Sequence, residues 1–190
     1  MEFRSEFGED QWIFENLHGK LPLEGFYVDA GCLWPERMSN TFFLRQIGWD
    51  GLAIDANAEV AREWAANDWV QRPMIVAVLS DEPTGTFKME ENALASRMDP
   101  SGLPVQCRTL ESILLEHKAW KVDLLSIDIE GHEFNVMKGL DYALHDPSII
   151  IAEYSTKDLG EDFRLREFLE GKGYKVVHTT TANFIYTKEL

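Results

Sequence analysis

Short apolar runs alternate along the chain with segments in which apolar residues recur at helical spacing. The runs that predict β-strands cover 25–30, 51–56, 74–79, 122–129, 148–154, 174–179 and 183–188, with a weaker edge strand over 84–90. Helical spacing covers 39–47, 58–68, 110–118, 133–142 and 162–170. This alternation predicts an α/β fold with a mainly parallel sheet.

The pattern predicts one domain over residues 1–190, because a chain of this length can bury one sizeable core but hardly two. An N-terminal helical segment is expected within 1–20, and Ser39 is expected to cap the helix over 39–47. The stretch 92–104 is rich in turn-forming residues, which predicts a mobile loop over the active site. The most apolar run, 122–129, is expected to form a central strand.

Composition limits the binding partners and the cellular compartment that are expected for the protein. The chain has 33 acidic and 18 basic side chains, and its net charge of −15 repels nucleic acid and anionic lipid. No run approaches the roughly 20 apolar residues that a membrane helix needs, and the N-terminus lacks a secretory pattern. The two cysteines, Cys32 and Cys107, are too few for a disulfide framework. The sequence therefore predicts a soluble, cytoplasmic protein with no nucleic-acid or membrane partner.

Four predicted strands end in a carboxylate, and these are Asp29, Asp55, Asp128 and Glu153. Ligands of open parallel sheets bind outside the carboxyl ends of the strands, where the strand order reverses. One acidic strand end alone is equally well explained as a helix cap or as a hydrogen-bond partner for a loop. Four at the same edge favour a binding site.

The turn after the first strand contains Gly31, which permits close approach of a ligand and an unusual φ angle. A dinucleotide fingerprint needs three glycines to hold a pyrophosphate, whereas Cys32, Leu33 and Trp34 follow here. Asp55 ends the second strand, where an acidic side chain commonly binds ribose hydroxyls, although it could also cap the next helix. A ribose acid without a pyrophosphate loop favours S-adenosylmethionine over NAD.

The turn within 126–134 holds a dense cluster of ionisable side chains. Asp128 and Glu130 are candidates to orient a cofactor ammonium group or an acceptor hydroxyl, and His132 has an ordinary pKa suited to general-base catalysis. The alternative is that Glu130 and Glu133 are acidic because the helix dipole favours negative charge at the N-terminus of a helix, and that His132 is merely exposed. A divalent ion on these carboxylates also fits the cluster, but we assign no metal ligand.

Two residues of the first turn are weaker candidates. Trp34 could attract a sulfonium group by a cation–π interaction, although most tryptophans only pack. Cys32 has no histidine nearby to activate it, so packing or backbone contact with a cofactor is the better interpretation.

Several longer motifs occur in order along nearly the whole chain. They are SEFGEDQWI, FYVDAG followed by Pro35 and Ser39-Asn40-Thr41, GWDGLAIDANAE, AVLSDEPTG, LLSIDIEGHEFNVMKG, the strand end at Glu153, and the terminal GYKVV and NFIY. In these motifs the chain resembles the FkbM-type methyltransferases, a branch of the class I, Rossmann-like methyltransferases. It departs from them in the first loop, where Cys32, Leu33 and Trp34 stand in place of alanine followed by polar residues or histidines.

The resemblance implies a three-layer Rossmann-like fold with a mainly parallel seven-stranded sheet and an antiparallel C-terminal strand. It implies S-adenosylmethionine as cofactor and methyl transfer to a hydroxyl of a sugar or another small molecule. The cofactor-binding residues are then expected to be Asp29, Gly31, Cys32, Trp34, Asp55, Asn57, Ser80, Asp81 and Asp128. The catalytic residues are expected to be Asp128, Glu130 and His132.

Two other classes of function compete with methyl transfer. An inactive binding or scaffold protein on the same fold is supported by the unusual Leu33 and Trp34. A nicotinamide-dependent oxidoreductase is disfavoured by the missing glycines.

Overall fold

The computed structural model describes residues 1–89, 96–154 and 159–188. Its helices are α1 (Glu9–Leu17), the 3₁₀ helix η1 (His18–Lys20), α2 (Phe42–Gln46), α3 (Ala61–Ala65), α4 (Leu110–Glu116), α5 (Glu133–Lys138) and α6 (Leu159–Gly171). Its strands are β1 (Phe26–Ala30), β2 (Asp50–Asp55), β3 (Ile75–Val76), β4 (Val78–Leu79), β5 (Thr84–Lys88), β6 (Arg97–Met98), β7 (Leu103–Arg108), β8 (Leu124–Ile127), β9 (Ile149–Glu153), β10 (Lys175–Thr179) and β11 (Asn183–Thr187).

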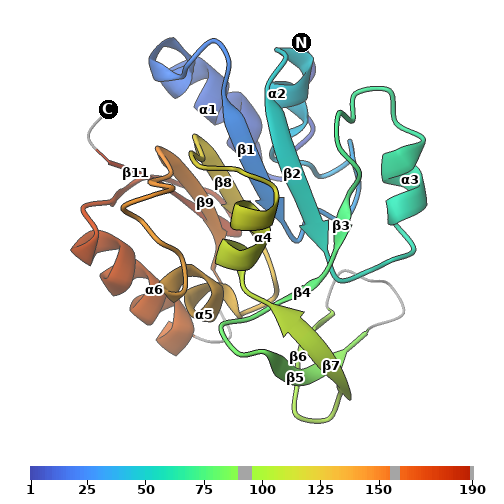
Figure 1. Cartoon of the computed structure of the whole chain (residues 1–190). Helices are drawn as coiled ribbons and strands as arrows, with labels where there is room; N and C mark the ends of the chain where they lie inside the picture. The colour runs from blue at the N-terminus through green and yellow to red at the C-terminus, as the bar shows by residue number, and fades with distance from the viewer. Residues whose placement is uncertain (90–95, 155–158, 189–190) are drawn as a thin grey trace.

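The main sheet has seven strands in the order β10-β11-β9-β8-β1-β2-β3 (Figure 1). The pairings β1–β2, β1–β8, β2–β3 and β8–β9 are parallel, whereas β11 is antiparallel to both β9 and β10. The predicted α/β class and the antiparallel last strand are therefore present. The strand β8 lies at the centre, as its apolar sequence predicts, and all four of its residues are buried.

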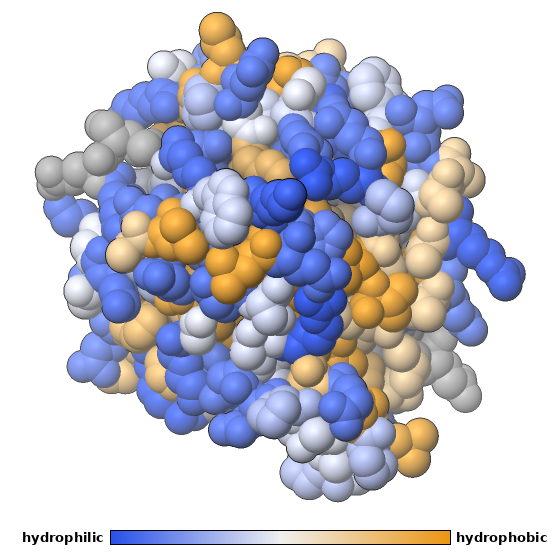
Figure 2. Space-filling view, viewed as in Figure 1, coloured by the Kyte–Doolittle hydropathy of each residue, from blue (hydrophilic) through white to orange (hydrophobic). Residues whose placement is uncertain are grey.

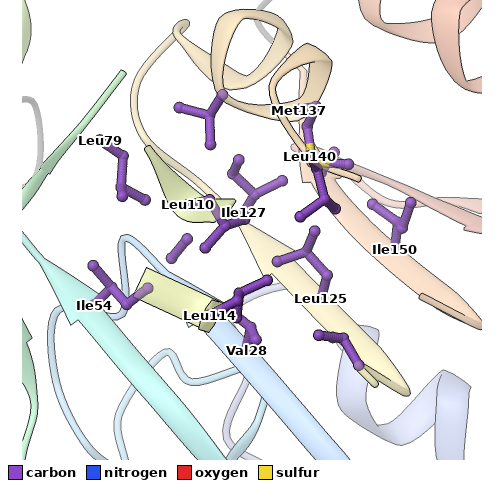
Figure 3. Packing of buried hydrophobic residues seen from close by; sticks show 14 of the residues in the cluster. Val28, Ile54, Leu79, Leu110, Leu114, Leu125, Ile127, Met137, Leu140 and Ile150 are labelled. Carbon is purple, nitrogen blue, oxygen red and sulfur yellow. The ribbon is translucent and has the colours of Figure 1, made fainter. Parts of the chain in front are cut away.

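Helices cover both faces of this sheet. On one face, strand residues such as Val28, Leu125 and Ile150 pack against α4 and α5 through Leu110 and Met137 (Figure 3). On the other face, the strand residues that point the opposite way pack against α1 and α2. Burial on both faces explains why β1, β8 and β9 are almost continuously apolar rather than alternating.

A second sheet, in the order β4-β7-β5-β6, lies beyond the carboxyl ends of β1 and β2 (Figure 1). The single strand expected over 74–79 is split between the two sheets, because β3 pairs with β2 while β4 pairs with β7. The break falls at Ala77, whose N–H donates to the carbonyl of Asp55 at 2.9 Å. The chain thus passes from one sheet to the other at the edge where ligands are expected.

The structure bears on three local predictions. Within 1–20, only the residues from Glu9 onward are helical. Ser39 does not cap α2, which begins at Phe42; its hydroxyl is buried and accepts a hydrogen bond from the Thr41 N–H at 3.3 Å. The stretch 92–104 includes strand residues of β6 and β7, while 92–95 lie outside the described residues.

Polar residues cover much of the surface. The face in Figure 2 is mainly hydrophilic, with apolar residues in groups between them. Among the residues that the structure describes, no helix is long and apolar enough to span a membrane.

Candidate active site

A cavity of about 390 Å³ opens at the carboxyl ends of the central strands. Gly31, Asp55 and Asp128, which follow or end β1, β2 and β8, all line it. Residues of the second sheet, among them Phe87 and Met98, form part of the wall. The three positions on which the cofactor prediction depends therefore lie around one open space.

Gly31 is held where only glycine fits. Its φ is +82°, and a Cβ atom there would overlap the carbonyl oxygen of Asp128. Its N–H donates to the Ile54 carbonyl at 2.8 Å, which ties the turn to β2. The ends of β1, β2 and β8 consequently meet closely at this glycine.

Asp55 closes the loop after β1 around its carboxylate. The backbone N–H of Leu33 donates to Oδ2 at 2.8 Å, and that of Asn57 donates to Oδ1 at 2.7 Å. Burial raises the pKa of Asp55. The carboxylate lines the cavity and has about four acceptor sites, so it can still receive a ribose hydroxyl. Asn57 itself is buried and accepts the Glu59 N–H at 2.9 Å, which makes it a turn residue beside the cavity.

Asp29 lies behind the cavity wall and is not among the described residues that line it. The Thr41 hydroxyl donates to its Oδ2 at 2.6 Å, and Arg45 in turn donates to Thr41 at 3.2 Å and to the Pro35 carbonyl. Burial raises the pKa of Asp29 to about 6, against the lowering effect of Thr41. This buried network holds the loop after β1 in place from behind the cavity wall.

Cys32 and Trp34, the two weaker candidates of the loop after β1, lie in different places. Cys32 lines the cavity but is 6% exposed, and burial raises the pKa of its thiol well above the ordinary value. Trp34 is not among the described lining residues; the guanidinium of Arg37 lies 3.4 Å from its ring centroid, and the ring packs near Trp64. Arg37, rather than Trp34, lines the cavity.

Ser80 and Asp81 connect the end of β4 to the two ends of α5. The Ser80 hydroxyl lies 3.1 Å from Nε2 of His132, and Asp81 forms an ion pair with Lys138 at 2.7 Å. Neither residue is among the described lining residues, where Val78 and Leu79 stand instead.

His132 lines the cavity, yet both of its ring nitrogens have partners. Nε2 contacts the Ser80 hydroxyl, and Nδ1 lies 3.0 Å from the Asn135 amide nitrogen. An imidazole held from both sides suits positioning better than proton abstraction.

The turn between β8 and α5 is folded around Glu133, the first residue of α5. Its Oε1 accepts the N–H groups of Ile129 at 2.8 Å and Gly131 at 3.2 Å. Glu130 has a φ of +60° and Gly131 a φ of +90°. The strained turn brings Glu130 to the cavity wall, where it lies near His132.

Asp128 and Glu153 form the acidic centre of the site. Their carboxyl groups hydrogen-bond to each other, and burial raises the pKa of each, reinforced by the neighbouring carboxylates. One oxygen each of Asp128, Glu133 and Glu153 lie within 4.8 Å of one another. Protein surrounds Asp128 on its other sides, but the residue lines the open cavity. Solvent therefore reaches its carboxyl group from the cavity. Such a pair shares a proton, and the cluster is also compact enough to contact a single cation.

A comparison with protein families identifies the chain. The model of the FkbM methyltransferase domain matches residues 39–176, which include Asp55, Asp128 and Glu153. The chain belongs to the FkbM methyltransferase family. A search of curated proteins found no match. Several residues that line the cavity lie outside the matched range, among them Gly31, Glu9 and Asn183.

In this FkbM methyltransferase, the carboxylates Asp55, Asp128 and Glu153 line the cavity at the sheet edge where the sequence predicts them. Of the predicted site residues, those that line the cavity are Gly31, Cys32, Asp55, Asp128, Glu130 and His132. Those placed behind or beside it are Asp29, Trp34, Asn57, Ser80 and Asp81. Sequence reasoning missed Asn183, because only the pairing of β11 with β9 brings it opposite Glu153.

Proposed function

We propose that this FkbM methyltransferase uses S-adenosylmethionine and transfers its methyl group to a hydroxyl of a sugar or another small molecule. The fold we propose is the three-layer, Rossmann-like class I arrangement. The observation that carries the proposal is that Gly31, Asp55 and Asp128 line one cavity at the carboxyl ends of β1, β2 and β8. The two free cysteines fit a reducing compartment, so we include a cytoplasmic location in the proposal.

The residues present fit this cofactor. Asp55 offers a carboxylate acceptor for the ribose, and Gly31 has no side chain to obstruct the cofactor beside it. Val78 and Leu79 give an apolar wall for the adenine, with Ser80 and Asp81 supporting that wall from behind. When bound, S-adenosylmethionine supplies an electrophilic methyl group on its sulfonium.

The acidic centre supplies the acid–base chemistry. In an in-line displacement the acceptor oxygen must be held close to the methyl carbon, and its proton must be lost. Asp128 faces the cavity and accepts that proton, while Glu153 hydrogen-bonds to Asp128 and stabilises its charge. Glu130 and His132 complete the wall, and we propose that they position the acceptor.

A scaffold role is the second candidate, and its two supporting residues do not block the cavity. Leu33 uses its backbone N–H to hold Asp55, and Trp34 packs outside the described lining. These departures therefore leave the cofactor-binding groups in place.

Calorimetry with S-adenosylmethionine tests the proposal directly. We expect binding in the micromolar range to the full chain, followed by transfer of radiolabel from the cofactor to a hydroxylated small molecule. Absence of cofactor binding would overturn the proposal, and binding without transfer to any compound of a broad panel would favour the scaffold.

A further inference from the structure

The cavity has two ends, which follow from the order of the strands. Asp55 on β2 marks one end, and β8, β9 and β11 mark the other. If the adenosine occupies the first end, the acceptor must enter at the second. The walls of that second end therefore carry information about the acceptor.

Two segments far apart in the chain build the second end. Glu9, which is 1% exposed, accepts hydrogen bonds from the Thr180 hydroxyl at 2.7 Å and from the Asn183 amide at 2.8 Å. Asn183 stands directly opposite Glu153 in the β9–β11 ladder. The start of α1 is thereby fixed against the turn before β11, and Glu6 and Phe7 join the wall.

The groups at this end are almost all hydrogen-bond acceptors. Glu9, Asp128, Glu130 and Glu153 line it, and Arg37 and His132 are the basic side chains among the described lining residues. Asn183 is 6% exposed and lines the cavity, yet its Oδ1 has no hydrogen-bond donor among the described residues. A ligand that brings several donors and a positive charge would complement this wall.

The compactness and charge of the acidic cluster indicate which donor. A primary ammonium carries three N–H groups and a positive charge on one atom, so it can contact several neighbouring carboxylates at once. The oxygens of Asp128, Glu133 and Glu153 lie within 4.8 Å of one another. An ammonium would also replace the proton that crowding forces Asp128 and Glu153 to share.

We propose that Asp128 and Glu153, with Asn183 beside them and the buried charge of Glu133 next to them, bind a primary ammonium group, and that the methyl acceptor is a hydroxylated primary amine. This inference rests on the proposed function. One oxygen of Asp128 contacts the ammonium, and the other remains to accept the hydroxyl proton. Phosphorylated or carboxylated acceptors are repelled by the same wall.

The test uses matched acceptors that differ only in charge. The full chain is given radiolabelled S-adenosylmethionine and a panel of amino alcohols, each paired with its neutral hydroxyl analogue and an anionic one, such as glucosamine, glucose and glucose 6-phosphate. We expect kcat/KM for the amines to exceed that of their neutral analogues at least about tenfold, with still less transfer to the anions. Equal transfer, or a preference for neutral or anionic compounds, overturns the inference.

A matched pair of variants locates the preference. Glu133→Gln keeps an oxygen for the two backbone N–H groups but removes a charge, and should reduce the amine preference about tenfold. Glu24→Gln makes the same change at an exposed position and should leave the preference unchanged. If Glu133→Gln instead weakens cofactor affinity and leaves the preference intact, the cofactor's own amino group occupies the cluster and the inference is wrong.

Failure of this inference is separable from failure of the proposed function. Loss of the proposed function appears as no cofactor binding in the wild-type chain, whereas the inference fails with cofactor binding intact. If the cofactor binds but no compound is methylated, saturation-transfer NMR measures which compounds of the same panel bind to the chain. Selective binding of the amines supports the site, and no selectivity overturns it. Transfer that requires an added divalent metal and stops with a chelator assigns the cluster to a metal instead.

Discussion

At the scale of single residues, the site depends on carboxylates whose surroundings give each a different task. Asp55 receives two backbone N–H groups and so combines a local structural role with free acceptor sites. Asp29 is held by Thr41 outside the cavity, and Asp128 faces into it. The same side-chain type at three strand ends thus holds the loop at Asp29 and Asp55 and faces the cavity at Asp55 and Asp128.

Asp55→Asn should weaken S-adenosylmethionine binding by about tenfold or more, because hydrogen bonds to a charged acceptor contribute about 1.5–3 kcal/mol. The asparagine keeps the size of the side chain and one oxygen, so the fold should survive the loss of one of the two hydrogen bonds from Leu33 and Asn57. Calorimetry measures the affinity, with Asp68→Asn at an exposed position as the control. An unchanged affinity would remove Asp55 from the ribose contact.

The carboxyl of Asp128 should titrate near neutrality, because burial and then the charge of Glu133 raise its pKa to about 7. Glu133→Gln removes that charge, so the titration of Asp128 should move to lower pH. Carboxyl ¹³C NMR of the labelled chain follows both titrations without an acceptor. The same midpoint in both proteins would show that Glu133 does not act on Asp128.

At the scale of elements, the long apolar runs were predictable, while the places where elements begin, end or divide were not. The runs behind β1, β2, β8 and β9 are buried on both faces, so their sequence is nearly uninterrupted and easily found. The run over 74–79 looks equally continuous, but Ala77 changes sheets by donating to Asp55. Such a break depends on a partner strand that the local pattern does not contain.

The helix α4 offers a test at this scale, since it packs Leu110, Ile113 and Leu114 into the core. Thr109 caps it by accepting the Ser112 N–H at 3.1 Å. Thr109→Ala should lower the free energy of unfolding by about 1 kcal/mol, whereas Thr109→Ser keeps the hydroxyl and should lose much less. Urea denaturation compares the two, and equal losses would assign the effect to the methyl group rather than to the cap.

At the scale of the whole molecule, the candidate site was predictable where one strand and its own turn make it. Gly31, Asp55 and Asp128 each follow directly from a strand, so parallel pairing alone brings them together. Glu9 and Asn183 lie 174 positions apart and meet only because β11 returns antiparallel beside β9. No local pattern signals that contact, and the end of the cavity beside β9 and β11 depends on it.

The buried network below the first loop also affects the stability of the entire fold. Asp29 is 5% exposed, and burial raises its pKa from the ordinary 3.8 to about 6. Between those values the folded state binds more protons than the unfolded state, so this group's contribution to stability is lost as the pH rises from about 4 to about 6. A shift of this size corresponds to about 3 kcal/mol.

Asp29→Asn removes the titration but leaves an oxygen for the Thr41 hydroxyl. The wild-type chain should therefore lose stability relative to the variant as the pH rises through that window, and the difference should level off above it. Urea unfolding at a series of pH values measures the free energy of both proteins, and subtracting one curve from the other cancels the remaining carboxylates. Parallel curves would mean that Asp29 titrates alike in the folded and unfolded chains, and that Thr41 and Arg45 fully compensate the burial of its charge.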